Sequence, residues 1–202
     1  MYSTFDAIIF DLGGVVLNLD YQLTIDAFKK LGLEDFEAMY TQAKQSDLFD
    51  RFETGQISSQ HFINKLLPFL PNDVTPNQVV HAWNAMILDF PIERLKFIEN
   101  LNVNQPIYLL SNTNEIHLNA VKRVLAKVVE KPLSDYFTKV YYSHEVQLRK
   151  PHHEIFKLVC DENKLNPSKT LFIDDTLGHI EGAKSYGLNT FHLTNEYVIE
   201  DL

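Results

Sequence analysis

Cysteine and basic residues are scarce in this chain of 202 residues. Its one cysteine, Cys160, has no partner for an internal disulfide bond, which is typical of a cytoplasmic protein. Cys160 lies in the apolar helical pattern EIFKLVC, so we expect it in the core and not as a nucleophile. The 18 lysines and arginines face 27 aspartates and glutamates, and the net charge of −9 argues against general binding to nucleic acid.

Long apolar runs are also missing, and we expect no leader sequence. No stretch approaches the ~20 apolar residues that a membrane span needs, so we expect no membrane contact. The N-terminal MYSTFDAIIF lacks the basic segment and cleavage site of a secretion signal. Nothing in the sequence indicates an obligate protein partner. An apolar content of 45% is sufficient for a packed core, and the length suits one domain with a modest insertion.

Short apolar strands alternate with amphipathic helices over most of the chain. The strand segments that we expect are residues 7–12, 107–112, 139–144, 170–175 and 189–194. Alternation of this kind predicts an α/β fold with a doubly wound, Rossmann-like parallel sheet.

Residues 17–90 break this alternation, because they contain helical patterns separated by glycine and proline and no buried strand. We therefore expect a core domain of residues 1–16 and 91–202, with a small helical cap inserted after the first strand. The insertion follows Asp11 directly, which favours a lid over the strand ends. The alternative is a helical subdomain that only stabilises the core.

Polar side chains stand where three of the predicted strands end, and a lysine precedes a later helix. The carboxyl ends of parallel strands face one side of a sheet, so these side chains are expected to converge. Each alone has a simpler explanation, such as a helix cap or a solvated lysine. As a set they predict a site made of Asp11, Ser111, Asn112, Lys150, Asp174 and Asp175.

Acids, amides and a cation in one place indicate phosphate chemistry. Neighbouring carboxylates repel one another unless a cation lies between them, and Mg²⁺ favours one or two carboxylates together with phosphate oxygens. Ser111, Asn112, Lys150 and the backbone amides near Gly13 would then hold a phosphate group. A carboxylate can attack phosphorus to give an aspartyl-phosphate. We therefore expect a magnesium cofactor and a small phosphorylated metabolite as the partner.

Four motifs occur in the order FDLGGVV, LLSNTN, RKP and FIDDTLGHIEGA. Together with VYYSHEVQLRKPHHEIF and FETGQISSQHF, they resemble the haloacid dehalogenase superfamily of phosphohydrolases over nearly the whole chain. The insertion is similar to the helical cap of one large branch of that superfamily. Within it, the chain resembles sugar-phosphate phosphatases of the glucose-1-phosphate type.

The resemblance also implies a role for each motif residue. Asp11 would be the nucleophile and a magnesium ligand, with the backbone carbonyl of Gly13 and the Asp175 carboxylate as further ligands. Asp174 would be a ligand itself or the neighbour of one. The side chains of Ser111 and Asn112 would bind phosphoryl oxygens, and Lys150 would contact both Asp11 and the phosphate.

Gly13 departs from the superfamily pattern, because its phosphatases usually carry a second aspartate there. That aspartate protonates the leaving alcohol and then activates water, and such help contributes about 10²–10⁴-fold to the rate. Three interpretations stay open: another group from the cap or a water chain replaces it, the leaving group needs little protonation, or the protein binds without catalysis. Sugar-phosphate phosphatases with the motif DLGN also have glycine here, which favours an active enzyme.

Our main hypothesis is a magnesium-dependent phosphatase of a small phosphomonoester, such as a sugar phosphate, with an aspartyl-phosphate intermediate on Asp11. The alternatives are a non-catalytic phospho-ligand-binding protein, a phosphomutase and a haloacid dehalogenase. A dehalogenase needs no metal, and the Asp174–Asp175 pair argues against it. The cap residues that we expect to select the substrate are Tyr21, Phe49, Arg51, Phe52, His61, Trp83 and Met86.

Overall fold

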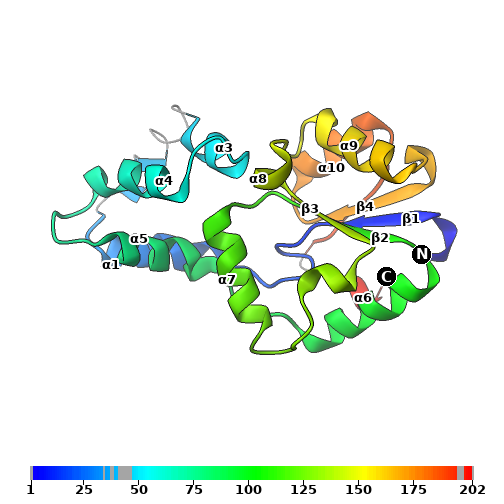
Figure 1. The fold of residues 1–202 in the computed structure, drawn as a ribbon, viewed down its shortest axis with the longest axis horizontal. Helices are drawn as coiled ribbons and strands as arrows, with labels where there is room; N and C mark the ends of the chain where they lie inside the picture. Colours follow the sequence, from blue (N-terminus) through cyan, green and yellow to red (C-terminus); the bar gives the residue numbers. More distant parts are fainter. Residues whose placement is uncertain (1, 34, 37–38, 41–46, 195–197, 202) are drawn as a thin grey trace.

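The computed structural model describes residues 2–33, 35–36, 39–40, 47–194 and 198–201 (Figure 1). Its centre is a parallel five-stranded sheet in the order β3-β2-β1-β4-β5. The predicted α/β fold with a doubly wound sheet is confirmed. The strands are β1 (Ala7–Phe10), β2 (Ile107–Ser111), β3 (Lys139–Tyr142), β4 (Thr170–Asp174) and β5 (Asn189–His192).

Each strand is slightly shorter than its predicted segment. β1 ends one residue before Asp11, and Ser143 begins the short helix α8 (Ser143–Val146) where a strand was expected to continue. The apolar pattern marks the buried part of each strand, and the one or two residues that follow it already belong to the next loop or helix.

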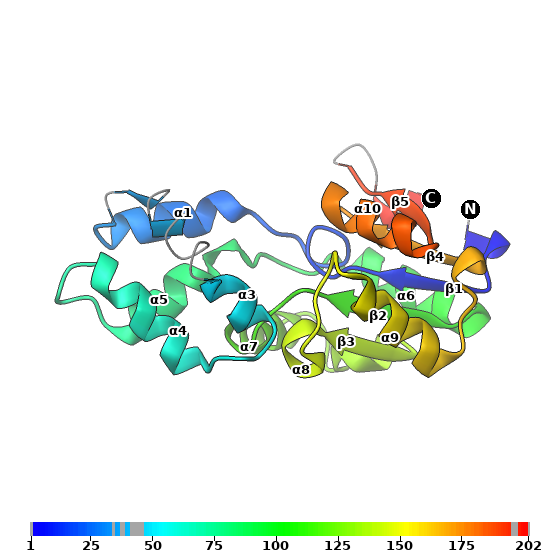
Figure 2. The same ribbon diagram turned by 90° about the horizontal axis from the view of Figure 1, so that it is seen from above.

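Helices cover both faces of the sheet, as Figures 1 and 2 show. Ile8 and Phe10 pack with side chains of α6 (Ile92–Asn104) and α7 (Glu115–Leu125). Their neighbours in β1, Ala7 and Ile9, face the opposite way and pack with α9 (His153–Asn163) and α10 (Leu177–Tyr186). Strand side chains alternate between faces, so a continuous apolar run builds two cores. Cys160 lies in the second core, as expected.

A second group of helices lies beside the sheet domain and forms its own hydrophobic cluster, centred on Phe28, Phe62 and Leu66 (Figure 2). Asp20, Ser58 and Thr75 cap the N-termini of three of these helices with their side chains. Part of the helical pattern expected within residues 17–90 lies outside the described residues. The described helices of this group are α1 (Tyr21–Lys30), α3 (Leu48–Glu53), α4 (Ser59–Leu66) and α5 (Pro76–Trp83).

Two neighbouring segments connect this helical group to the sheet domain. Leu19 and Ile87 form an antiparallel bridge, and the Asn18 amide donates to the Asp89 carbonyl at 3.0 Å. Pro91 directly precedes the first residue of α6. The bounds of the expected domains, 1–16 with 91–202 and 17–90, stay a prediction.

The remaining helical segments are short 3₁₀ turns at Tyr2–Thr4, Leu67–Phe69, Asn84–Met86, Leu133–Tyr136, Pro167–Lys169 and Ile199–Asp201. Within the described residues, the helices are too short or too polar to traverse a bilayer.

Candidate active site

Three carboxylates meet beyond the carboxyl ends of β1 and β4. Asp11 follows β1 and Asp174 ends β4, and these strands are hydrogen-bonded neighbours. Oxygen atoms of Asp11, Asp174 and Asp175 all lie within 4.8 Å of one another. The structure therefore brings together the three acids that the sequence analysis placed at strand ends.

Lys150 lies fully buried between two of these acids. Its Nζ atom donates to Asp11 Oδ1 at 2.7 Å and to Asp174 Oδ2 at 2.6 Å. Burial acts to lower the pKa of Lys150, but the two carboxylates outweigh it and raise that pKa. The lysine is therefore held as a cation, and breaking such a buried pair is costly.

The carboxylate of Asp174 is hydrogen-bonded to several groups of the protein itself. Besides Lys150, its carboxylate accepts from the Thr176 amide at 2.8 Å and contacts the Nδ1 atom of His179 at 3.0 Å. Burial acts to raise the pKa of Asp174, but Lys150 and His179 outweigh it and lower the pKa to about 2. Asp174 is thus an ionised group that positions the lysine.

The pKa of Asp11 is shifted in the opposite direction. Burial raises its pKa to about 7, with a further contribution from Asp174 and Asp175, although Lys150 counteracts them. One lysine does not compensate three carboxylates, and a divalent cation would supply the missing positive charge. Oxygen donors of this kind fit Mg²⁺.

Gly13 and Gly14, which follow Asp11 and Leu12, each lie against a different side chain. Gly14 has a φ of +72°, and a Cβ atom there would lie 2.1 Å from Asp175 Oδ2, so only glycine fits. A Cβ atom on Gly13 would lie 2.5 Å from Leu19 Cδ1. The loop closes through Gly14 N to Leu17 O and Leu17 N to Leu12 O, both at 2.8 Å, so these bonds leave the Gly13 carbonyl to other partners.

Ser111 and Asn112 reach the site at the end of β2, in different ways. Ser111 is the buried last residue of the strand and lines the cavity together with Gly13. The Asn112 side chain accepts from the Lys150 amide and donates to the Lys150 carbonyl, each at 2.9 Å. Its amide therefore clamps the lysine backbone, and direct contact of Asn112 with phosphate stays a prediction.

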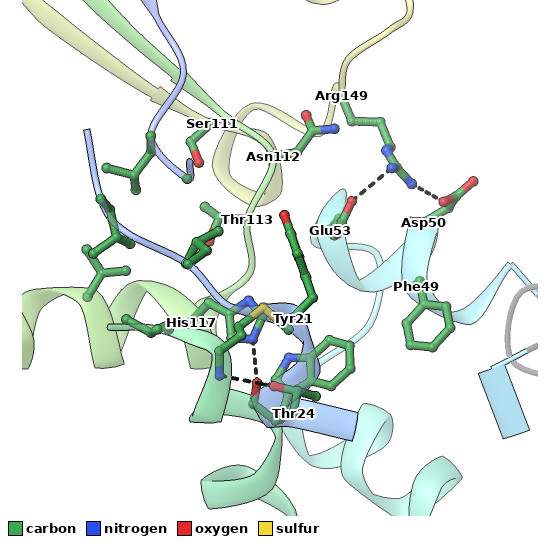
Figure 3. A pocket seen from close by; sticks show the side chains of 18 of the residues that line it. Tyr21, Thr24, Phe49, Asp50, Glu53, Ser111, Asn112, Thr113, His117 and Arg149 are labelled. Carbon is green, nitrogen blue, oxygen red and sulfur yellow. Dashed lines mark hydrogen bonds and ion pairs between the residues drawn. The ribbon is translucent and has the colours of Figure 1, made fainter. Parts of the chain in front are cut away.

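A cavity of about 610 Å³ separates this site from the helical group (Figure 3). Gly13, Ser111 and Asn112 line one end. Of the predicted selecting residues, Tyr21, Phe49, Trp83 and Met86 line it, whereas Arg51, Phe52 and His61 do not. Phe52 is buried in the helical cluster instead, and Arg51 and His61 are exposed.

Sequence reasoning missed a charged group in the wall of this cavity. Arg149 pairs with Glu53 at 3.0 Å and also with Asp50, both on α3 (Figure 3). The signal was present, because Glu53 lies in the segment FETGQISSQHF and Arg149 directly precedes Lys150. What the sequence did not reveal is that these two segments face each other.

Comparison with known families decides the assignment. The sequence model of the haloacid dehalogenase-like hydrolase family matches residues 5–187. The chain belongs to this family. Within the part that the model matches lie all the candidate residues of this hydrolase, from Asp11 to Asp175.

This hydrolase is 32% identical to D-ribitol-5-phosphate phosphatase of Bacteroides thetaiotaomicron over 188 residues, 93% of this chain and 91% of that enzyme. It also resembles a crystal structure of the enzyme bt-2542 from B. thetaiotaomicron, with a TM-score of 0.89 and 31% identity over 98% of this chain and 97% of that one. A structure of bt-2542 in complex with magnesium and inorganic phosphate matches with a TM-score of 0.87 and 32% identity, over 96% of this chain and 97% of that one. L-2-haloacid dehalogenase from Xanthobacter autotrophicus shares the fold. It is 19% identical, with a TM-score of 0.62 over 95% of this chain and 80% of that one.

Proposed function

We propose that this hydrolase is a magnesium-dependent phosphatase of a small phosphomonoester, with sugar and polyol phosphates as its substrate class. The observation that carries the proposal is the cluster of Asp11, Asp174 and Asp175 around buried Lys150. Gly13, two residues after Asp11, and Asn112, which is hydrogen-bonded to Lys150, line the cavity. Two relatives support it: one is named a D-ribitol-5-phosphate phosphatase, and a structure of bt-2542 holds magnesium and inorganic phosphate.

In this proposal, a carboxylate oxygen of Asp11 attacks phosphorus and forms an aspartyl-phosphate while the bond to the leaving oxygen breaks. Lys150 holds Asp11 in place and balances negative charge as it develops. The Ser111 hydroxyl and the backbone amides near Gly13 bind the phosphoryl oxygens. Water then attacks the same phosphorus, which releases phosphate and the free Asp11 carboxylate.

We assign the metal site to Asp11, the Gly13 carbonyl and Asp175, with Asp174 next to them. Asp174 already accepts from Lys150 and Thr176 and contacts His179, so its main task is to hold the lysine. Asp175 is half-buried. Bound Mg²⁺ would act as a Lewis acid on the phosphoryl group.

The helices between residues 17 and 90 form the lid of this site in our proposal. The cavity lies between them and the sheet, and Arg149 ties α3 to the segment that carries Lys150. A lid in this place excludes water from the aspartyl-phosphate and selects the leaving group. We place the enzyme in the cytoplasm, where a lone cysteine such as Cys160 stays reduced.

The test is turnover of p-nitrophenyl phosphate and of a panel with D-ribitol 5-phosphate and hexose 1-phosphates, with Mg²⁺ or with EDTA. We expect phosphate release that requires Mg²⁺ and is lost in Asp11→Asn. Absence of turnover on every compound, or full activity of Asp11→Asn, would contradict the proposal.

The same assays separate the other functions on this scaffold. Phosphate-ester binding by calorimetry without turnover would identify a binding protein. An isomerised phosphate ester as the product would identify a mutase. Halide release from a 2-haloacid in EDTA would identify a dehalogenase.

A further inference from the structure

Hydrolysis of an alkyl phosphate needs a proton for the leaving alkoxide, and position 13 offers no side chain to supply it. The space next to Gly13 is filled by the apolar side chain of Leu19. The proton donor must therefore reach the leaving oxygen from another wall of the cavity.

The histidines near the site do not meet this need. His117 has both ring nitrogens engaged, with the Trp83 carbonyl at 3.0 Å and the Asn114 side chain at 3.2 Å. Burial lowers its pKa to about 4, so it stays neutral. His179 contacts Asp174 at 3.0 Å and Asn112 at 3.4 Å through its two nitrogens.

Tyr21 is also unsuited to move a proton in both directions. Its pKa is raised by burial and by the nearby carboxylates, first among them Asp175. The hydroxyl therefore remains protonated and can donate a hydrogen bond, but it cannot become the base for the second step.

Glu53 lies in a wall of the cavity from which a proton donor could reach the leaving oxygen. It lines the same cavity as Gly13, Ser111 and Asn112, and it lies near enough to Lys150 to feel its charge. Figure 3 shows its carboxylate beside Arg149, at the end of the cavity where Asn112 lies. Oε2 is buried and pairs with Arg149 at 3.0 Å without a well-directed hydrogen bond, so it keeps capacity for another partner.

We propose that Glu53 is the general acid and base of this enzyme and supplies the proton transfer that position 13 lacks. The inference rests on the proposed phosphatase function. As Asp11 attacks phosphorus and the ester P–O bond breaks, the Glu53 carboxyl gives its proton to the leaving oxygen. The resulting carboxylate then takes a proton from the water that attacks the aspartyl-phosphate, which restores protonated Glu53 and releases phosphate.

The electrostatics of the cavity suit this cycle. Burial raises the pKa of Glu53 to about 7, although Lys150 counteracts it, so both protonation states are accessible near neutral pH. The other ionisable residues in the lining are Tyr21, Tyr40, Asp47, Asp50, His117 and Arg149, which pairs with Glu53. Further ionisable residues on α4 and α8, which also pack against α3, lie outside this lining: His61, Lys65, His144 and Glu145.

Asp50 provides a matched control on the same helix. Both carboxylates pair with Arg149, but the side chain of Asp50 is 61% exposed and that of Glu53 is 27% exposed. Replacement of either by its amide weakens the tie to Arg149. A role in proton transfer is therefore visible only as a difference between the two variants.

The experiment compares two leaving groups with wild type, Glu53→Gln and Asp50→Asn, all loaded with Mg²⁺. The alkyl ester is D-ribitol 5-phosphate, or the fastest primary-alkyl phosphate of the panel, and the aryl ester is p-nitrophenyl phosphate, whose phenolate leaves without protonation. In Glu53→Gln we expect kcat/KM, which reports formation of the aspartyl-phosphate, to fall about 10²–10⁴-fold for the alkyl ester and less than about fivefold for the aryl ester. The variant's kcat should fall for both esters, because attack of water on the shared aspartyl-phosphate loses its base. Asp50→Asn should lower kcat/KM of both esters by a similar factor, less than about fivefold, since exposed ion pairs contribute little.

The pH profile gives a second readout. With the alkyl ester, wild-type kcat/KM should decrease above pH about 7 as Glu53 loses its proton. Glu53→Gln should lack this alkaline limb. Retained aryl-ester turnover shows at the same time that the variant is folded.

Each contrary result has a distinct meaning. Equal losses of kcat/KM on both esters in Glu53→Gln, no loss at all, or the same leaving-group selectivity in Asp50→Asn would overturn the role of Glu53. Wild type that hydrolyses neither ester with Mg²⁺ would overturn the proposed phosphatase function, and the inference with it.

Discussion

Leu19 occupies the space into which a side chain at position 13 would project, with its Cδ1 atom 2.5 Å from where a Cβ atom on Gly13 would lie. Leu19 belongs to the segment that pairs with Ile87 and connects the helical group to the sheet. Because φ of Gly13 lies outside the left-handed region, sterics and not backbone strain restrict this position. The missing aspartate is thus accompanied by an apolar side chain that takes its space.

Gly13→Asp is therefore expected to lower the free energy of unfolding by about 1–3 kcal/mol, the usual cost of overpacking. Leu19→Ala should relieve the clash, so the double variant should be more stable than the sum of the two single effects. Urea unfolding of all four proteins tests this coupling. Strict additivity would show that position 13 and Leu19 do not compete for the same space.

Magnesium binding should survive in the same Gly13→Asp variant. The proposed ligand at this position is the main-chain carbonyl, which an added side chain does not remove. Calorimetry with MgCl₂ on wild type and Gly13→Asp measures it directly. A variant that no longer binds Mg²⁺ would rule out the carbonyl as a ligand.

The sheet and the meeting of its acids were predictable, because each depends on local pattern. An apolar run followed at once by a polar residue marks the end of a buried strand, and parallel pairing then places Asp11 and Asp174 side by side. The end of α10 is local in the same way, because Gly187 adopts the left-handed conformation that glycine favours after a helix.

The cavity wall formed by Glu53 and Arg149 was not predictable, because it depends on how the helices of residues 17–90 pack against the sheet domain. Glu53 and Arg149 are far apart in the sequence, and neither carries a pattern that reports their contact. The clamp of Asn112 on Lys150 is hidden for the same reason, since both residues fit equally well as direct phosphate ligands.

Asn112→Ala should remove that clamp and leave polar groups of a buried lysine without partners. We expect a loss of about 1–3 kcal/mol in the free energy of unfolding, together with reduced turnover because Lys150 is no longer held. Exposed Asn119 on α7 offers a control, and Asn119→Ala should change stability by less than about 0.5 kcal/mol. Equal stability of the two variants would argue that the clamp is unimportant.

Asp11→Asn should make the protein less sensitive to pH in the absence of metal. The folded state raises the pKa of Asp11 to about 7, above its value in the unfolded chain, so it binds this proton more strongly. The free energy of unfolding of the wild type in EDTA should therefore decline between pH 4 and pH 7. Asn at this position cannot bind the proton, so the variant should lack this part of the decline. Urea unfolding at pH 5 and pH 8 measures it, and an equal decline in both proteins would contradict the raised pKa.

Gly14→Ala should damage the metal site, because the new methyl group would lie 2.1 Å from Asp175 Oδ2 and φ of +72° disfavours any side chain. Asp175 must then move, and we expect Mg²⁺ affinity to fall about 10–100-fold. Gly178 in α10 is the matched control, since a Cβ atom there meets nothing within 4 Å. Gly178→Ala should keep Mg²⁺ affinity and gain up to about 1 kcal/mol of stability from helix propensity. Calorimetric titration of both variants with MgCl₂ decides the matter: wild-type affinity in Gly14→Ala would mean that Asp175 does not hold the metal.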